Sequence, residues 1–142
     1  MSIQIVMMLP PKAGSVSLAR HTMAEALKIP GVAPECIDEA QVALSEACSN
    51  FLRRFRADQN FEVLINIGDT ELTVHILDSK AGFPSDRLLA NWPGVQVDRE
   101  HGLALMTAFA DQASFESEGG GGSVRIKKGL RWSSDTALPP SG

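Results

Sequence analysis

The stretch FEVLINIGDTELTVHILD, residues 61–78, contains the pattern that decides the fold. Apolar residues recur at every second position from Phe61 to Ile67, the pair Gly68-Asp69 follows, and the alternation resumes at Leu72. A period of two residues is typical of a β-strand with one buried face, and a Gly-Asp pair suits a tight turn. We therefore predict an antiparallel hairpin whose second strand buries Leu72, Val74 and Ile76.

Three elements are predicted on the N-terminal side of this hairpin. Residues Ile3 to Leu9 form an apolar strand that ends at Pro10-Pro11, because proline donates no ladder hydrogen bond. Apolar residues at helical spacing run from Ser15 until Pro30-Gly31, and again from Ala33 to Arg56. The second helix also has a polar stripe opposite its apolar face, formed by Glu39, Glu46, Asn50 and Arg53.

The C-terminal side begins with a long irregular segment, Ser79 to His101, which is rich in Gly and Pro and contains one short possible helix at Arg87 to Ala90. Loops of this length are uncommon in compact domains unless they act as lids. A helix from Gly102 to Ala110 and strands at 113–115 and 123–127 follow. We predict an α+β fold, a two-layer α/β sandwich with the helices on one face of a mixed, mostly antiparallel sheet. The domain covers residues 1–128, and 129–142 form a mobile tail.

Composition excludes several classes of function. The 142 residues include 13 Lys+Arg and 17 Asp+Glu, for a net charge of −4, so the broad positive field that selects nucleic acid is missing. The longest apolar run, Ile3 to Leu9, is far shorter than the roughly 20 residues that span a bilayer. Cys36 and Cys48 belong to one helix and have no metal-binding pattern. We expect a cytoplasmic protein with reduced thiols and no direct contact with nucleic acid or membrane.

Asp78 is the first candidate functional residue. It shares the predicted inner face of the hairpin with Leu72, Val74 and Ile76. An unpaired carboxylate in such a place costs several kcal/mol, so it needs a cation, backbone donors or the N–H groups of a ligand. The alternative is an aspartate that bends to solvent at the end of the strand.

Glu46 and Asn50 form the second candidate, because residues four apart lie side by side on a helix. A carboxylate and an amide oxygen in that arrangement can hold a hard cation such as Mg²⁺ or orient a nucleophile. They can equally be polar residues on a solvated helix face. Glycines at 82, 102 and 119–122, the last followed by Ser123, can close backbone N–H groups on phosphate or merely form turns. Neither GxxxxGK[ST] nor GxGxxG occurs.

The order of these features resembles the anti-sigma-factor serine kinases of the histidine kinase, gyrase and MutL ATPase superfamily, which bind ATP in the Bergerat fold. The resemblance covers about Ile3 to Lys128. Residues 43–51, ALSEACSNF, resemble the N box, which implies that Glu46 is the catalytic base and Asn50 the magnesium ligand. Residues 74–84, VHILDSKAGFP, resemble the adenine box, which implies that Asp78 accepts the adenine amino group beside Lys80 and Gly82.

The remaining two boxes lie closer to the C-terminus. Residues 100–106, EHGLALM, resemble the third box, whose backbone at Gly102 and Leu103 would cap the phosphates. Residues 122–126, GSVRI, resemble the closing strand with Ser123. Three positions depart from the family pattern: Lys80 replaces a Gly, Ala104 replaces the second Gly of the third box, and Arg54 stands where many relatives have His. The Lys80 side chain could obstruct the close approach of the base or, alternatively, reach for phosphate. The first two changes could weaken nucleotide binding.

The resemblance implies a protein-serine/threonine kinase that uses ATP and Mg²⁺. It would phosphorylate a serine of an anti-sigma-factor antagonist of the STAS type and thereby control the release of a sigma factor, and it would act as a homodimer. The alternative is a non-catalytic Bergerat-fold module that binds partners and has weakened or lost ATP binding. A metal-independent hydrolase based on His21, His75 or His101 has little support, because no nucleophile motif accompanies these residues.

Overall fold

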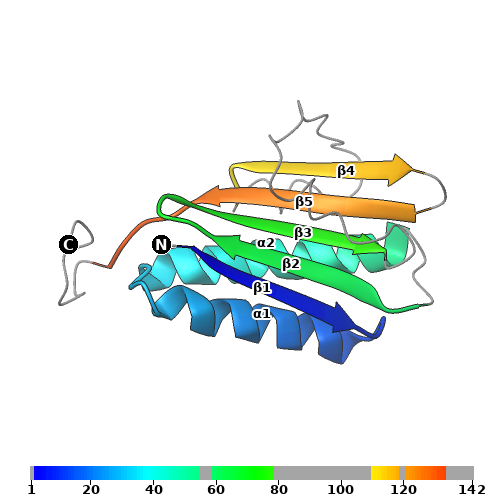
Figure 1. Cartoon of the computed structure of the whole chain (residues 1–142), viewed down its shortest axis with the longest axis horizontal. Coiled ribbons are helices and arrows are strands. Elements are labelled where there is room, and N and C mark those ends of the chain that lie inside the picture. The colour runs from blue at the N-terminus through cyan, green and yellow to red at the C-terminus, as the bar shows by residue number, and fades with distance from the viewer. Residues whose placement is uncertain (1, 55–58, 79–109, 119–120, 134–142) are drawn as a thin grey trace.

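The computed structural model describes residues 2–54, 59–78, 110–118 and 121–133. Along the chain these form β1 (Ile3–Leu9), α1 (Ala13–Lys28), α2 (Pro34–Arg54), β2 (Phe61–Ile67), β3 (Glu71–Asp78), β4 (Gln112–Glu118) and β5 (Gly121–Gly129). Both helices cover the same face of a single sheet (Figure 1). The predicted two-layer α+β fold is therefore confirmed, and each of these elements matches a predicted one to within a few residues.

The sheet has the strand order β1-β2-β3-β5-β4. All four described pairings are antiparallel, whereas the sequence predicted a mixed sheet that is mostly antiparallel. The predicted hairpin is present, with Phe61 opposite Asp78 and Ile65 opposite Val74. The backbone N–H of Gly68 donates to the carbonyl of Glu71 at 2.9 Å and closes the turn.

The hydrophobic core fills the space between the two helices and the inner face of the sheet. The alternating residues of β2 and β3 meet the apolar stripe of α2, and α1 packs beside them. Removing these large side chains from water supplies the main favourable term in folding. The fully buried residues of this core include Met23, Leu27, Leu44, Phe51, Phe61, Ile65, Ile67, Leu72 and Ile76.

The turn between the helices depends on Gly31, whose φ of 91° lies in the left-handed region that L-residues with a side chain rarely adopt. Its N–H donates to the carbonyl of Lys28 at 3.1 Å, and the N–H of Val32 donates to Leu27 at 3.2 Å. These bonds satisfy carbonyls at the end of α1 that have no partner within the helix. The predicted end of the first helix at Pro30-Gly31 is thus confirmed, with a physical cause.

Residues 129–133 belong to the fold, although the sequence predicted that the tail begins at 129. The N–H of Leu130 donates to Thr70, and the N–H of Ala33 donates to the carbonyl of Arg131. Trp132 forms a β-bridge with Val32 on the inter-helix turn. These contacts join residues 129–133 to the domain, and residues 134–142 of the expected tail lie outside the described residues.

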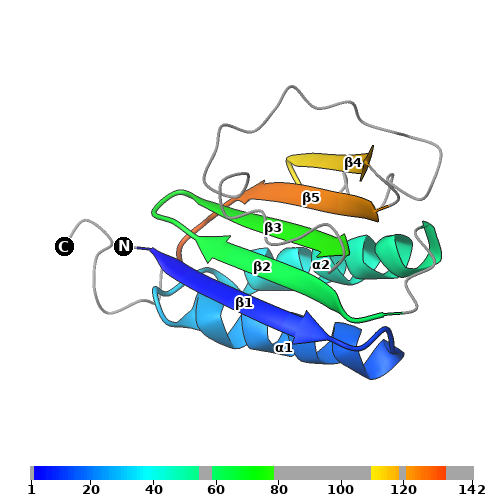
Figure 2. The ribbon, with the colours of Figure 1, turned by 45° about the vertical axis from the view of Figure 1, so that its right-hand side comes forward.

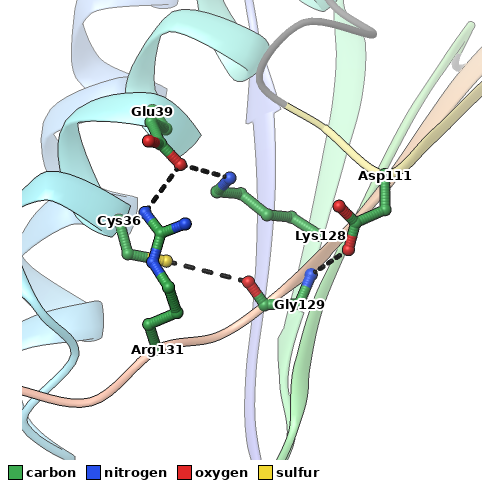
Figure 3. A network of polar contacts seen from close by, with 6 residues as sticks. All are labelled: Cys36, Glu39, Asp111, Lys128, Gly129 and Arg131. Atoms are coloured by element: carbon green, nitrogen blue, oxygen red, sulfur yellow. Dashed lines mark hydrogen bonds and ion pairs between the residues drawn. The ribbon is translucent and has the colours of Figure 1, made fainter.

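A polar network anchors the N-terminal half of α2 to β5 (Figure 3). Glu39 Oε1 accepts hydrogen bonds from Lys128 Nζ and from Arg131 Nη2, each at 2.8 Å. Cys36 Sγ donates to the carbonyl of Gly129 at 3.8 Å, and the N–H of Gly129 donates to Asp111 Oδ2 at 2.6 Å. The polar stripe predicted for this helix therefore faces the sheet at Glu39, is buried at Asn50 and is exposed at Arg53. Other exposed residues of α2 include Glu35, Asp38 and Val42.

The sheet face that points away from the helices, here called the outer face, also has buried polar residues. Register places Leu64, His75, Arg125 and Ser114 in one row across four strands. All four are buried, and Arg125 Nε donates to His75 Nε2 at 3.4 Å. His75 lies on the opposite face from Asp78. Its contact with Arg125 offers no support for a histidine-based hydrolase.

Candidate functional site

The C-terminal half of α2 and the carboxyl end of β3 lie at the same end of the sheet (Figure 2). The aromatic rings of Phe51 on α2 and Phe61 on β2 are in contact, with centroids 5.8 Å apart. Phe61 is in turn directly opposite Asp78 in the hairpin ladder. Asn50 precedes Phe51, so the folded chain brings the second candidate pair and Asp78 to one region. The network around Glu39 lies toward the other end of α2.

Asp78 is the last residue of β3 and is half-buried. Cross-strand partners in a sheet share a face, so its position opposite Phe61 places it on the face that the helices cover. That is the face predicted from the alternation of Leu72, Val74 and Ile76, which all belong to the core. The Asp78 carboxylate therefore lies at the edge of the core, at the end of β3.

Glu46 and Asn50 are neighbours on one turn of α2, as predicted. The side chain of Asn50 is only 3% exposed, which excludes the interpretation of this residue as part of a solvated surface. Its Nδ2 donates to the main-chain carbonyl of Glu46 at 2.9 Å. Its Oδ1 accepts a hydrogen bond from Arg53 Nη2 at 3.1 Å. The Glu46 carboxylate takes no part in these bonds, and the residue is half-buried.

These oxygen atoms fit Mg²⁺ only as part of a larger set of ligands. Among the described residues, no three His, Cys, Asp or Glu side chains are grouped to hold a metal ion. Mg²⁺ is commonly held by one or two protein oxygens, with phosphate oxygens and water completing the octahedron. Asn50 Oδ1 is one candidate oxygen of this kind, and the orientation of its amide is fixed because Nδ2 donates to the Glu46 carbonyl.

Ser123 lies at the same end of the sheet but not on the same face as Asp78. It pairs with Leu77, and its neighbours Val124 and Ile126 belong to the core beneath the helices. Alternation therefore puts the Ser123 side chain on the outer face, where it is buried. Because β3 and β5 are antiparallel and Leu77 pairs with Ser123, the β5 residue on the same face at the level of Asp78 is Gly122. Only the pairing register of β5 shows that Gly122, and not Ser123, shares the sheet face of Asp78.

Four predicted site residues, Lys80, Gly82, Gly102 and Leu103, lie outside the described residues. The predicted lid at 79–101 and the predicted helix at 102–110, which includes Ala104, also lie outside the described residues, except for Ala110. For Arg54 only the backbone is described. Sequence reasoning placed Arg53 on the polar stripe without giving it a role. Its spacing of three residues from Asn50 was the signal that predicts a contact between them.

The described part of the chain contains no helix that is both long and apolar enough to cross a membrane. Cys36 and Cys48 are buried free thiols, as predicted.

Comparison with known proteins identifies the family. Histidine kinase-like ATPase domains match residues 9–128. Proteins named serine-protein kinase RsbW from Bacillus cereus strain AH187 and Bacillus anthracis strain A0248 are each 30% identical over 110 residues. The match covers 72% of this chain and 69% of each relative. The chain thus shares both the domain type and much of the length of proteins that are named as serine kinases.

A solved structure of the RsbU and RsbW domains of a Mycobacterium tuberculosis protein has the same fold. It superposes with a TM-score of 0.67 at 18% identity and covers 90% of this chain. The chain spans 32% of the length of that larger protein chain. From the family match over 120 consecutive positions, 9–128, and from the similar fold, the chain belongs to the family of histidine kinase-like ATPase domains.

Proposed function

We propose that this protein is a cytoplasmic anti-sigma regulatory factor that binds ATP with Mg²⁺ and phosphorylates a serine of a STAS-type anti-sigma-factor antagonist. The observation that carries the proposal is that Glu46, Asn50 and Asp78 lie at the same end of the sheet, connected through the contact of Phe51 with Phe61. Its second support is the name of the 30%-identical relatives, serine-protein kinase RsbW. The resemblance of these residues to the N box and the adenine box and the name of the relatives support phosphoryl transfer to a protein hydroxyl group.

Asp78 would provide the specificity for adenine. A carboxylate accepts hydrogen bonds and donates none, so it matches the exocyclic amino group of adenine and not the carbonyl oxygen that guanine has at the same ring position. Its half-buried position at the end of β3, at the edge of the core, supports a contact with a planar base there. Gly122, on the neighbouring strand, has no side chain beyond hydrogen to obstruct that base.

Glu46 would act as the general base for the seryl hydroxyl. A bond forms between the serine Oγ and the γ-phosphorus, the bond from that phosphorus to the β,γ-bridging oxygen breaks, and ADP leaves. The hydroxyl proton passes to a carboxylate oxygen of Glu46. Asn50 Oδ1 would hold Mg²⁺, which supplies charge neutralisation on the triphosphate when it is bound. Positioning by the helix and electrostatic stabilisation account for most of the rate enhancement in such reactions.

The partners follow from the same proposal. An unphosphorylated antagonist would compete with a sigma factor for the protein, and phosphorylation would end that competition. The protein would act as a homodimer. Its net charge of −4 fits a factor that binds a sigma subunit and does not itself bind DNA.

The decisive experiment compares E46Q with wild type in two assays, ATP binding by calorimetry in the presence of Mg²⁺ and transfer of labelled phosphate to a purified STAS protein. We expect E46Q to bind ATP normally and to lose phosphoryl transfer by roughly 10²- to 10⁴-fold. E35Q is the matched control, because Glu35 is an exposed carboxylate on the same helix. Full phosphoryl transfer by E46Q would exclude Glu46 as the base.

The second candidate function is a partner-binding module without catalysis. It is supported by Lys80 and Ala104, which replace glycines of the family pattern at the expected nucleotide site. Absence of ATP binding by wild type up to high micromolar concentrations would favour that module. A pull-down from native lysate, with and without ATP, then identifies the partners. Recovery of neither a sigma factor nor a STAS protein would contradict the proposed regulatory role.

A further inference from the structure

The side-chain oxygen of Asn50 is already engaged in the ligand-free protein. Arg53, one turn further along α2, donates from Nη2 to Asn50 Oδ1 at 3.1 Å. The orientation of the amide is fixed independently, because Nδ2 donates to the Glu46 carbonyl at 2.9 Å. Asn50 Oδ1, the oxygen atom suited to a metal ion, therefore already accepts a hydrogen bond from the Arg53 guanidinium.

Among the described residues, little else holds Arg53 in this position. Its side chain is exposed, and within the described part of the chain its hydrogen bond to Asn50 is not accompanied by an ion pair with a carboxylate. Asn50, by contrast, is buried and fixed. An exposed guanidinium with one neutral acceptor is readily attracted to a doubly charged phosphate group, because charge-assisted bonds to phosphate are stronger and can be bidentate.

A guanidinium and a divalent cation repel each other when both lie at one oxygen atom. We propose that Arg53 is a positioning residue that keeps Asn50 Oδ1 closed to free metal ions and releases it when a polyphosphate attracts the guanidinium. Metal and nucleotide then bind together, and the metal alone binds poorly. This inference rests on the proposed function in one respect, the assignment of Asn50 as a metal ligand.

The test measures binding of Mn²⁺ alone, without nucleotide, by electron paramagnetic resonance of the free ion. Mn²⁺ is the probe because it substitutes for Mg²⁺ at oxygen ligands and is directly visible. We expect R53A to bind Mn²⁺ roughly tenfold more tightly than wild type, because the competing charge is removed. R53K retains a cationic donor near Oδ1 and should remain within about threefold of wild type. The double variant R53A/N50A should lose the gain.

R20A is the matched control, because Arg20 is exposed on α1 and its removal changes the net charge equally. It should bind Mn²⁺ like wild type. Equal Mn²⁺ affinity of R53A and wild type, including undetectable binding to both, would overturn the proposal, as would a gain in R20A equal to that in R53A. These outcomes do not depend on kinase activity. A wild type that binds ATP with Mg²⁺ and transfers phosphate, yet shows no effect of R53A, would disprove this inference and leave the proposed function intact.

Discussion

Glu39 on α2 and Lys128 on β5 form a 2.8 Å ion pair between residues 89 positions apart in the sequence. Lys128 is only 5% exposed, so its ammonium group is largely removed from water beside this carboxylate. Arg131 bonds the same carboxylate oxygen at 2.8 Å. The pair connects the helix that carries Glu46 and Asn50 to the strand that carries Gly122 and Ser123, and so helps to set the position of the candidate site.

The first prediction concerns the pH dependence of this contact. The hydrogen bond from Lys128 holds the pKa of Glu39 below its ordinary value. A lowered pKa stabilises the folded state above the unfolded pKa, and this contribution is lost as the pH falls through the folded pKa. We expect E39Q to lower the free energy of unfolding by about 2 kcal/mol at pH 7. Urea denaturation at pH 7 and below pH 4 measures the change, which should shrink at the acidic pH.

D38N is the control for this prediction, because Asp38 is an exposed carboxylate on the same helix. It should change stability by less than about 0.5 kcal/mol. A loss in E39Q that is no larger than the loss in D38N would show that the network contributes nothing to stability.

The second prediction has the opposite sign and concerns Glu62 on the outer face. Glu62 is 5% exposed, and within the described residues its Oε2 has no hydrogen-bond partner. Burial raises the pKa of this carboxyl group. Between the unfolded and the folded pKa the folded state holds more protons, so stability falls as the pH rises through this range. E62Q should therefore stabilise the protein at pH 7 and have a smaller effect near pH 4.

Thermal unfolding of E62Q and wild type across this pH range checks the prediction. E71Q serves as control, because Glu71 is an exposed carboxylate on β3 with an ion pair to Lys127 at 3.6 Å. It should be neutral or slightly destabilising at pH 7. Destabilisation by E62Q at pH 7 would mean that the carboxylate is satisfied in solution.

The elements of the fold could be predicted from local patterns, whereas the relation between distant residues could not. Alternation from Phe61 to Asp78 and helical spacing in α2 depend on neighbours in the sequence, so periodicity reveals them. The pairing of Glu39 with Lys128 depends on the strand order β1-β2-β3-β5-β4, which no local pattern specifies. The face of Ser123 was likewise undetermined, because a shift of one residue in register reverses every side chain of a strand.

The third prediction concerns the reactivity of Cys48. Burial raises the pKa of this thiol to about 12, and the thiolate is the reactive form. In a C36A background, which leaves Cys48 as the remaining thiol, the native protein should react with Ellman's reagent at least about a hundredfold more slowly than the protein unfolded in urea. Absorbance at pH 8 follows the reaction. Comparable rates in the two states would show that the helix–sheet interface opens readily around α2.

The fourth prediction separates base recognition from phosphate recognition at Asp78. If its carboxylate accepts the adenine amino group, D78N should weaken ATP binding by about 1.5–3 kcal/mol, which is roughly ten- to a hundredfold. Inorganic tripolyphosphate has no base, so its affinity should be the same for D78N and wild type. D69N, in the exposed turn of the same hairpin, should change neither affinity. Calorimetric titration in the presence of Mg²⁺ measures the affinity of each variant, D78N and D69N, for ATP and for tripolyphosphate relative to wild type.

The tripolyphosphate result decides between two roles of the Asp78 carboxylate. A contact with adenine is made only by ATP, so it predicts a loss confined to ATP. An electrostatic influence on the phosphates acts on both ligands and, since the residue is negative, predicts tighter binding of both after its neutralisation. Weaker ATP binding with unchanged tripolyphosphate binding therefore supports base recognition at the end of β3, and an equal change in both ligands excludes it.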